Sequence, residues 1–178
     1  MGAAVCTGLG MALSAPDRNV AVITGDGELQ MNLGSLNTVA TQSPGNLTIV
    51  CIDNGTHGET GGQEGHTVNR TSLGLIAQGA GIRSVMEITS ADQIQAAHDF
   101  IRNEPGPRFL WCRVLPGDPT AYKRNFNPAE CRIRFRDAYL GASTRQKKRP
   151  GNARPFFCPW LIRRSSSWQS CNRAVPCR

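Results

Sequence analysis

The sequence predicts an α/β fold with three layers, in which helices cover both faces of a mainly parallel β-sheet. Short, β-branched apolar runs alternate with segments of helical periodicity along residues 1–115, which is typical of βαβ units. Two of these runs end in Gly-rich polar triplets, GDG at 25–27 and DNG at 53–55. Because open parallel sheets bind ligands at the carboxyl ends of their strands, we expect both triplets at one functional edge.

The first half of the chain supplies the elements around these triplets. Residues 1–15 place small and apolar residues at helical spacing, and a Pro then ends the predicted helix. Runs 19–24 and 46–52 are predicted as buried strands, joined by a helix over 28–42 with leucines along one face. The Gly-rich loop 53–70 is too long for an idle connection, so we expect it to carry function.

The second half continues the alternation. A short helix over 72–79 precedes a strand at 84–88, and a helix over 90–103 begins with Ser-Ala-Asp, a start typical of a capped helix. The apolar run 108–115 closes the series as a third long strand.

Composition is that of a globular protein without a membrane partner. The chain is 39% hydrophobic, and no apolar run approaches the ~18 residues of a membrane span. The N-terminus has no basic residue before its apolar stretch and so does not resemble a secretory signal, which predicts a cytoplasmic location. Seven cysteines without a CxxC pair disfavour a disulfide framework and a zinc ribbon, and Cys51 and Cys112 are predicted as core residues.

The charge is unevenly distributed and divides the chain. The net charge is +7, yet residues 142–178 hold nine Arg or Lys and no acid, which leaves residues 1–141 mildly acidic. We therefore expect one domain over 1–141 and a basic, irregular and disordered tail over 142–178. A nucleic-acid or acidic-partner arm, or out-of-frame translation, are alternatives for the tail, and nucleic acid is not the preferred partner.

The residue types in the two triplets suit a metal and a phosphate. Asp26 and Asn54 offer a carboxylate and an amide oxygen, hard donors that suit Mg²⁺ or Ca²⁺. Mg²⁺ usually shares its coordination shell with substrate phosphates. The glycines around Asp26 allow close approach of the backbone, and a helix beginning at Glu28 offers free N–H groups to an anion. The alternatives are a simple turn for GDG, a hairpin for DNG, and a dinucleotide fingerprint in which Gln30 fills a glycine position.

At this point the sequence resembles a known family. The GDG triplet, the buried strand, Asp53-Asn54 and the TGGQ loop together resemble the diphosphate-binding domain of thiamine diphosphate (TPP) enzymes. The stretches "GDGELQMNLGSLNTVA" and "DNGTHGETGGQEGHT" are most similar to the sulfopyruvate and phosphonopyruvate decarboxylase group. The similarity covers about residues 1–141 and implies the TPP-binding fold in an N-terminally shortened form, because Met1-Gly2 matches an internal segment of the family.

The resemblance also implies a metal site and its ligands. It assigns Mg²⁺ to the carboxylate of Asp26, the side-chain oxygen of Asn54 and the main-chain carbonyl of Thr56.

The same resemblance implies how the diphosphate is held. Gly27 and Glu28 would present N–H groups to it, while His57 and Gly58 would lie beside it in the loop. His57 departs from the aromatic residue common in the family, and Asp53 replaces the first Asn of the superfamily's usual pair.

The implied activity is non-oxidative decarboxylation of a small 2-oxo acid, with TPP and Mg²⁺ as cofactors. The family activates TPP with a Glu from a separate pyrimidine-binding (PYR) domain, which this sequence lacks, so we expect a PYR-domain subunit as partner. No catalytic residue is assigned to this chain. The alternatives are a degenerate TPP-binding protein and a 2-oxoacid:ferredoxin oxidoreductase β-like subunit.

Overall fold

The computed structural model describes residues 1–117 and 125–144, of which 142–144 are described by their backbone alone. Two compact units divide the chain, Met1–Pro119 and Thr120–Arg178. The elements in chain order are α1 (Ala4–Ser14), β1 (Val20–Gly25), α2 (Asp26–Gln30), α3 (Gly34–Gln42), β2 (Leu47–Asp53), β3 (Thr56–His57), β4 (Gln63–Glu64), the 3-10 turn η1 (His66–Val68), α4 (Leu73–Gly79), β5 (Ser84–Ile88), the 3-10 turn η2 (Ala91–Gln93), α5 (Ile94–Asn103), β6 (Arg108–Arg113) and α6 (Pro128–Thr144).

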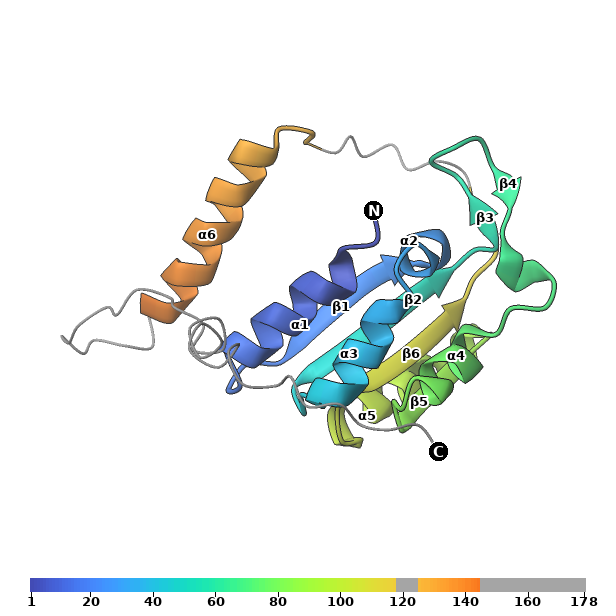
Figure 1. Ribbon diagram of the computed structural model, residues 1–178, viewed down its shortest axis with the longest axis horizontal. Coiled ribbons are helices and arrows are strands. Elements are labelled where there is room, and N and C mark those ends of the chain that lie inside the picture. The colour runs from blue at the N-terminus through green and yellow to red at the C-terminus, as the bar shows by residue number, and fades with distance from the viewer. Residues whose placement is uncertain (118–124, 145–178) are drawn as a thin grey trace, which may run out of the picture. The chain divides into compact units, whose positions relative to one another are not determined.

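The first unit is built on a four-stranded sheet in the order β1-β2-β6-β5, with every neighbouring pair parallel (Figure 1). The register aligns the carboxyl ends, because Gly25 pairs with Ile52 and Ile52 pairs with Cys112. The predicted α/β fold with a parallel sheet is therefore confirmed, and the two polar triplets leave the same edge of the sheet.

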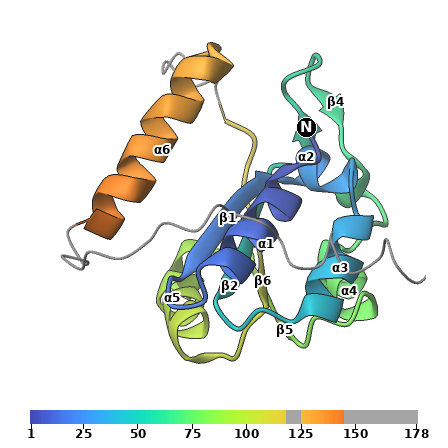
Figure 2. The same ribbon diagram turned by 60° about the vertical axis from the view of Figure 1, so that its left-hand side comes forward.

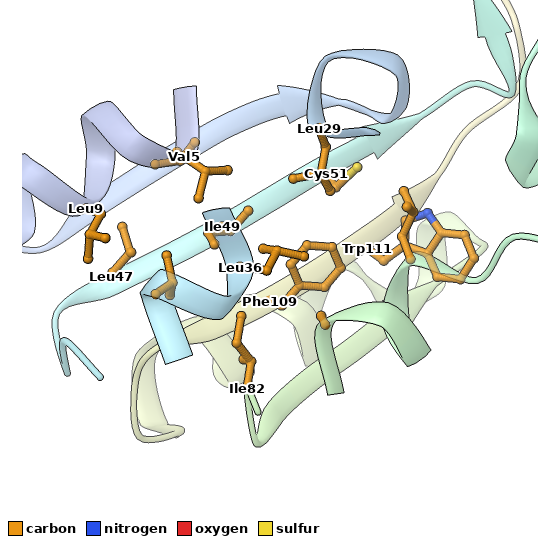
Figure 3. Close-up of a cluster of buried hydrophobic side chains, with 14 of the residues drawn as sticks. Val5, Leu9, Leu29, Leu36, Leu47, Ile49, Cys51, Ile82, Phe109 and Trp111 are labelled. Atoms are coloured by element: carbon orange, nitrogen blue, oxygen red, sulfur yellow. The ribbon is translucent and has the colours of Figure 1, made fainter. Parts of the chain in front are cut away.

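The main core lies on the face covered by α1, α3 and α4. Inward side chains of β1, β2 and β6 meet those of the helices there, as Figure 3 shows around Phe109 and Ile49. Gly8 lets α1 approach β1 closely, since a Cβ at that position would stand 2.0 Å from a methyl carbon of Val22. The prediction that Cys51 is a core residue is confirmed, because its side chain is fully buried in this cluster.

The opposite face of the sheet is covered less completely. Helix α5 packs there, on the other side of the sheet from α3 and α4 (Figure 2), and its Ala97 joins Leu110 and Cys112 in a second, smaller core. Ile23 of β1 points to the same face and is 73% exposed, since α5 packs on β5, at the opposite edge of the sheet from β1. The three-layer arrangement is thus asymmetric.

Two segments differ from the sequence expectations. The helix expected over 28–42 is broken into α2 and α3 by a turn at 31–33, where the side chain of Asn32 donates to the carbonyl of Gly2 at 2.9 Å. The loop over 53–70 contains the two-stranded antiparallel ribbon of β3 and β4 and then η1. The long loop is therefore an ordered, folded-back segment.

The second unit contributes a helix that the sequence analysis did not predict. Helix α6 begins after Asn127, whose side-chain oxygen accepts from the backbone N–H groups of Ala129 and Glu130. It runs past residue 141, and the division of the chain there stays a prediction. The expectations for the tail over 145–178 lie outside the described residues. None of the described helices has the length and apolar character needed to cross a lipid bilayer.

Candidate functional site

The carboxyl end of β1 carries a buried carboxylate with an unused oxygen. Asp26 is the first residue of α2 and only 3% of it is exposed. Its Oδ2 and the Nε2 of Gln30 are the buried side-chain atoms of the described residues without a hydrogen-bond partner. Burial raises the pKa of the Asp26 carboxyl, and the charge of Asp53 raises this pKa further, against weaker opposing effects of nearby N–H groups and His57. The site therefore holds an acceptor that needs a cation or a proton.

The carboxyl end of β2 carries a second carboxylate in the opposite condition. Asp53 is equally buried, yet its Oδ1 accepts from the Gly55 N–H at 2.8 Å and from the Thr67 hydroxyl at 2.8 Å. Its Oδ2 accepts from the indole N–H of Trp111 at 2.8 Å. The indole nitrogen of Trp111 is visible at the edge of the core in Figure 3. Asp53 therefore ties β2 to the loop, to η1 and to β6.

The loop after β2 closes on itself over Asp26. Gly55 has a φ of +67° and its carbonyl accepts from the Gly65 N–H at 2.6 Å. A Cβ at position 65 would stand 3.0 Å from the Asp26 Oδ2 and 3.0 Å from the Gly55 carbonyl oxygen. Asn54 turns the chain between these points, with its Oδ1 accepting from the Thr56 N–H at 3.0 Å. The loop thus brings Asn54 and Gly65 to the end of β1.

Glu28 directs its side chain away from the loop and toward the start of α1. Its carboxylate accepts from the Ala4 N–H at 3.1 Å and from the Thr24 hydroxyl. Burial opposes ionisation of Glu28, but hydrogen bonds from Thr24 and from the backbone of residues 2–4 outweigh it and lower its pKa. The side chain of Glu28 therefore caps α1, and the backbone of α2 is left to face the site.

His57 covers α2 from the loop side. A Cβ at Gly27 would stand 2.7 Å from the Nδ1 of His57, so the imidazole occupies the space that the glycine leaves open. The His66 ring lies 6.2 Å from that of His57, centroid to centroid, at a tilt of 58°. Gly58 follows His57 and is exposed, with no atom within 4 Å of its Cβ position.

The seven predicted site residues fall on two adjoining segments. Three of them start α2 and four lie between Asn54 and Gly58 at the end of β2. To these the structure adds Asp53, Thr67 and Gly65, which sequence reasoning did not select, although Gly65 lies in the Gly-rich loop. No three His, Cys, Asp or Glu side chains converge in the described part of the chain. A metal there would combine the one free carboxylate with neutral oxygens.

Comparison with known proteins identifies the family of the chain. The family model described as thiamine pyrophosphate enzyme, C-terminal TPP binding domain, matches residues 1–112. The phosphonopyruvate decarboxylase of Streptomyces viridochromogenes is 39% identical over 76% of this chain and 34% of its own length. The sulfopyruvate decarboxylase subunit beta of Methanocaldococcus jannaschii is 35% identical over 78% of this chain and 72% of its own length.

The fold is shared more widely than the sequence. A transketolase structure from Campylobacter jejuni superposes with a TM-score of 0.55 at 16% identity, over 64% of this chain and 20% of that chain. The chain spans about a third of the phosphonopyruvate decarboxylase it matches and most of the sulfopyruvate decarboxylase subunit. The chain therefore belongs to the family of C-terminal TPP-binding domains of thiamine pyrophosphate enzymes.

Proposed function

We propose that this chain holds the diphosphate end of TPP through Mg²⁺ at the carboxyl ends of β1 and β2. The observation that carries the proposal is the Asp26 Oδ2, a buried carboxylate oxygen without a partner among the described residues. A buried anion in that state is costly unless a cation joins it, and the fold brings an amide side chain and a loop backbone to the same edge.

The donors present fit Mg²⁺. Asp26, the Asn54 side chain and the Thr56 carbonyl would supply one carboxylate and two neutral oxygens, all hard ligands. A set with one negative charge leaves room for diphosphate oxygens and water in the coordination shell, which is the usual way that Mg²⁺ binds in phosphate sites. Gly65 supports this assignment, because its missing side chain keeps the space beside the Asp26 Oδ2 open.

The diphosphate would lie against the start of α2 and the loop. Gly27 and Glu28 would donate backbone N–H groups, and the Glu28 side chain would not compete because it caps α1. His57, whose ring stands against Gly27, would offer a further donor, and Gly58 would let the loop pass close to the cofactor.

The activity that we infer is non-oxidative decarboxylation of a small 2-oxo acid of the sulfopyruvate or phosphonopyruvate type. Bound TPP supplies the electron sink for that chemistry, while the protein binds and orients it. The names of the two relatives support the assignment. A relative named as a beta subunit supports a partner chain, and we propose that the partner carries the PYR domain.

Calorimetric titration of the full chain with TPP tests the proposal. We expect binding in the presence of Mg²⁺ that disappears with EDTA and in Asp26→Ala, and that persists in Asp17→Ala, a change of an exposed carboxylate at the other end of β1. Binding that ignores Mg²⁺ or survives in Asp26→Ala would contradict the proposed site. Failure of the wild-type chain to bind TPP would contradict the proposal that this chain holds the diphosphate by itself.

A further inference from the structure

Asp53 directly precedes the proposed metal ligand Asn54 and is hydrogen-bonded to the loop that carries it. Its carboxylate holds the N–H of Gly55, and the carbonyl of the same Gly55 holds the N–H of Gly65. Asn54 lies between Asp53 and Gly55, so its backbone is fixed on both sides. Gly65 in turn stands against the Asp26 Oδ2. The buried carboxylate of Asp53 is thus connected, through Gly55 and Gly65, to the space beside the Asp26 Oδ2.

The three partners of Asp53 come from separate parts of the chain. Thr67 belongs to η1 and is 4% exposed, while Trp111 belongs to β6 and is 3% exposed. The carbonyl of Thr67 also accepts from the guanidinium of Arg113 at 3.5 Å, and that guanidinium stacks over the Trp111 ring at 5.3 Å. The Asp53 carboxylate therefore connects the loop at Gly55 to η1 through Thr67 and to β6 through Trp111.

We propose that Asp53 is a positioning residue that holds Asn54 and Thr56 in place for Mg²⁺, and that Trp111 makes a carboxylate obligatory at this position. The proposal rests on the proposed function of the site. Backbone and indole N–H groups can donate but cannot accept, whereas the Thr67 hydroxyl can do both. Gly55 donates to one oxygen of Asp53 and Trp111 donates to the other.

An amide at position 53 cannot accept from both the backbone N–H of Gly55 and the indole N–H of Trp111. Asn has one oxygen and one NH₂ group, so in either orientation its NH₂ faces an N–H group, that of Gly55 or that of Trp111. In either orientation the N–H of Gly55 or the indole N–H of Trp111 is therefore left without an acceptor, and the loop relieves the conflict by moving. Replacing Trp111 by Phe removes one of the donors, after which Asn can direct its oxygen to Gly55 and its NH₂ to the ring.

The first readout needs no ligand. Hydrogen exchange measured by mass spectrometry on the ligand-free full chain should be at least about tenfold faster for the peptide over 54–68 in Asp53→Asn than in wild type. The peptide over 47–52 and the control Asp17→Asn should remain at wild-type rates. Unchanged exchange over 54–68 in Asp53→Asn would overturn the proposal.

The second readout is the Mg²⁺ concentration at half-saturation with TPP, measured where circular dichroism shows every variant folded. Changes around metal ligands typically cost 10–100-fold in metal affinity, so Asp53→Asn should raise this concentration by about tenfold or more. In the Trp111→Phe background the same change should raise it by less than about threefold. If Asp53 only added stability, Trp111→Phe would not abolish the effect of Asp53→Asn on the Mg²⁺ concentration at half-saturation.

The outcomes separate this inference from the proposed function. A wild-type chain that binds no TPP with Mg²⁺ contradicts the proposed function, whatever the exchange data show. If the wild-type chain binds TPP and Asp53→Asn reaches half-saturation at a Mg²⁺ concentration within about twofold of the wild-type value, the positioning role alone is overturned. Equal losses from Asp53→Asn with and without Trp111 overturn the requirement that Trp111 imposes.

Discussion

The ends of β1 and β2 carry two aspartates that are alike in burial and opposite in condition. Asp26 and Asp53 are each 3% exposed. Asp26 directly follows β1 as the first residue of α2, and Asp53 is the last residue of β2. Asp53 accepts three hydrogen bonds from the described residues, while the Asp26 Oδ2 accepts none from them. The two carboxylates therefore differ in that both oxygens of Asp53 have donors, whereas one buried oxygen of Asp26 has none among the described residues.

This difference separates a structural carboxylate from a binding one. A carboxylate whose two oxygens both accept hydrogen bonds stabilises the folded chain, whereas one with a buried oxygen that lacks a partner destabilises it until a ligand arrives. Changes at the two positions should therefore affect stability with opposite signs, and the following variants test the contrast from the largest effect to the smallest.

The largest effect is expected at the end of β2. Asp53→Ala leaves the N–H of Gly55, the hydroxyl of Thr67 and the indole N–H of Trp111 without their acceptor. Unsatisfied buried donors cost about 1–3 kcal/mol each, so the free energy of unfolding should fall by about 3 kcal/mol or more. Urea denaturation measures it, with Asp17→Ala as a matched surface control. A loss below about 1 kcal/mol would mean that Asp53 contributes little more to stability than a surface residue, which would contradict the contrast between Asp53 and Asp26.

The next variant, at Gly65, tests the contact between the loop that follows β2 and Asp26 at the end of β1. In Gly65→Ala the new Cβ meets the backbone carbonyl of Gly55 and the Asp26 Oδ2 at 3.0 Å, so the loop must shift. Overpacking of this kind costs about 1–3 kcal/mol, and thermal unfolding should report a value in that range. Gly58→Ala is the matched control in the same loop, because nothing lies within 4 Å of its Cβ position. Equal behaviour of the two alanine variants would contradict the packing of the loop on Asp26.

A smaller effect is expected at Glu28, which shares α2 with Asp26. Glu28→Gln weakens the cap on α1 and should lower the free energy of unfolding by about 1 kcal/mol at neutral pH. Because the pKa of Glu28 is lowered in the fold, its ionised form stabilises the chain above its ordinary pKa, and this contribution is lost as pH falls through the lowered value. Denaturation between pH 7 and pH 3 should therefore show the difference from wild type shrinking on acidification. A difference that is constant with pH would contradict the capping role.

The sequence was sufficient to predict that both polar triplets lie at one edge of the sheet, where the candidate site is. Asp26 and Asn54 are each read directly from a glycine-flanked triplet that follows a buried strand, and parallel pairing then brings the triplets together. The condition of Asp53 is different, because it depends on Thr67 and Trp111, which are 14 and 58 residues away. Tertiary partners at that separation leave no local pattern.

Two helical features were not predicted, namely helix α6 and the break between α2 and α3, and they have different causes. Asn127 followed by Pro128 is a recognisable helix start, but the alternation of Arg and apolar residues over 132–136 has strand periodicity and obscured α6. The break between α2 and α3 has no Pro to signal it, and it is accompanied by the contact of Asn32 with Gly2. Helical periodicity in 28–42 was therefore real, while its continuity was overridden by packing.

The most direct measurement is thermal unfolding of wild type and Asp26→Asn, each with and without Mg²⁺ and TPP. Because the Asp26 pKa is raised, its ionised form destabilises the ligand-free chain at neutral pH, and the destabilisation is relieved as pH falls through the raised value. We expect ligand-free Asp26→Asn to be more stable than wild type by about 1 kcal/mol at neutral pH, and only wild type to gain stability from the ligands. An Asp26→Asn chain that is less stable without ligands, or that gains as much from them, would contradict the assignment of Asp26 as the carboxylate that binds the metal.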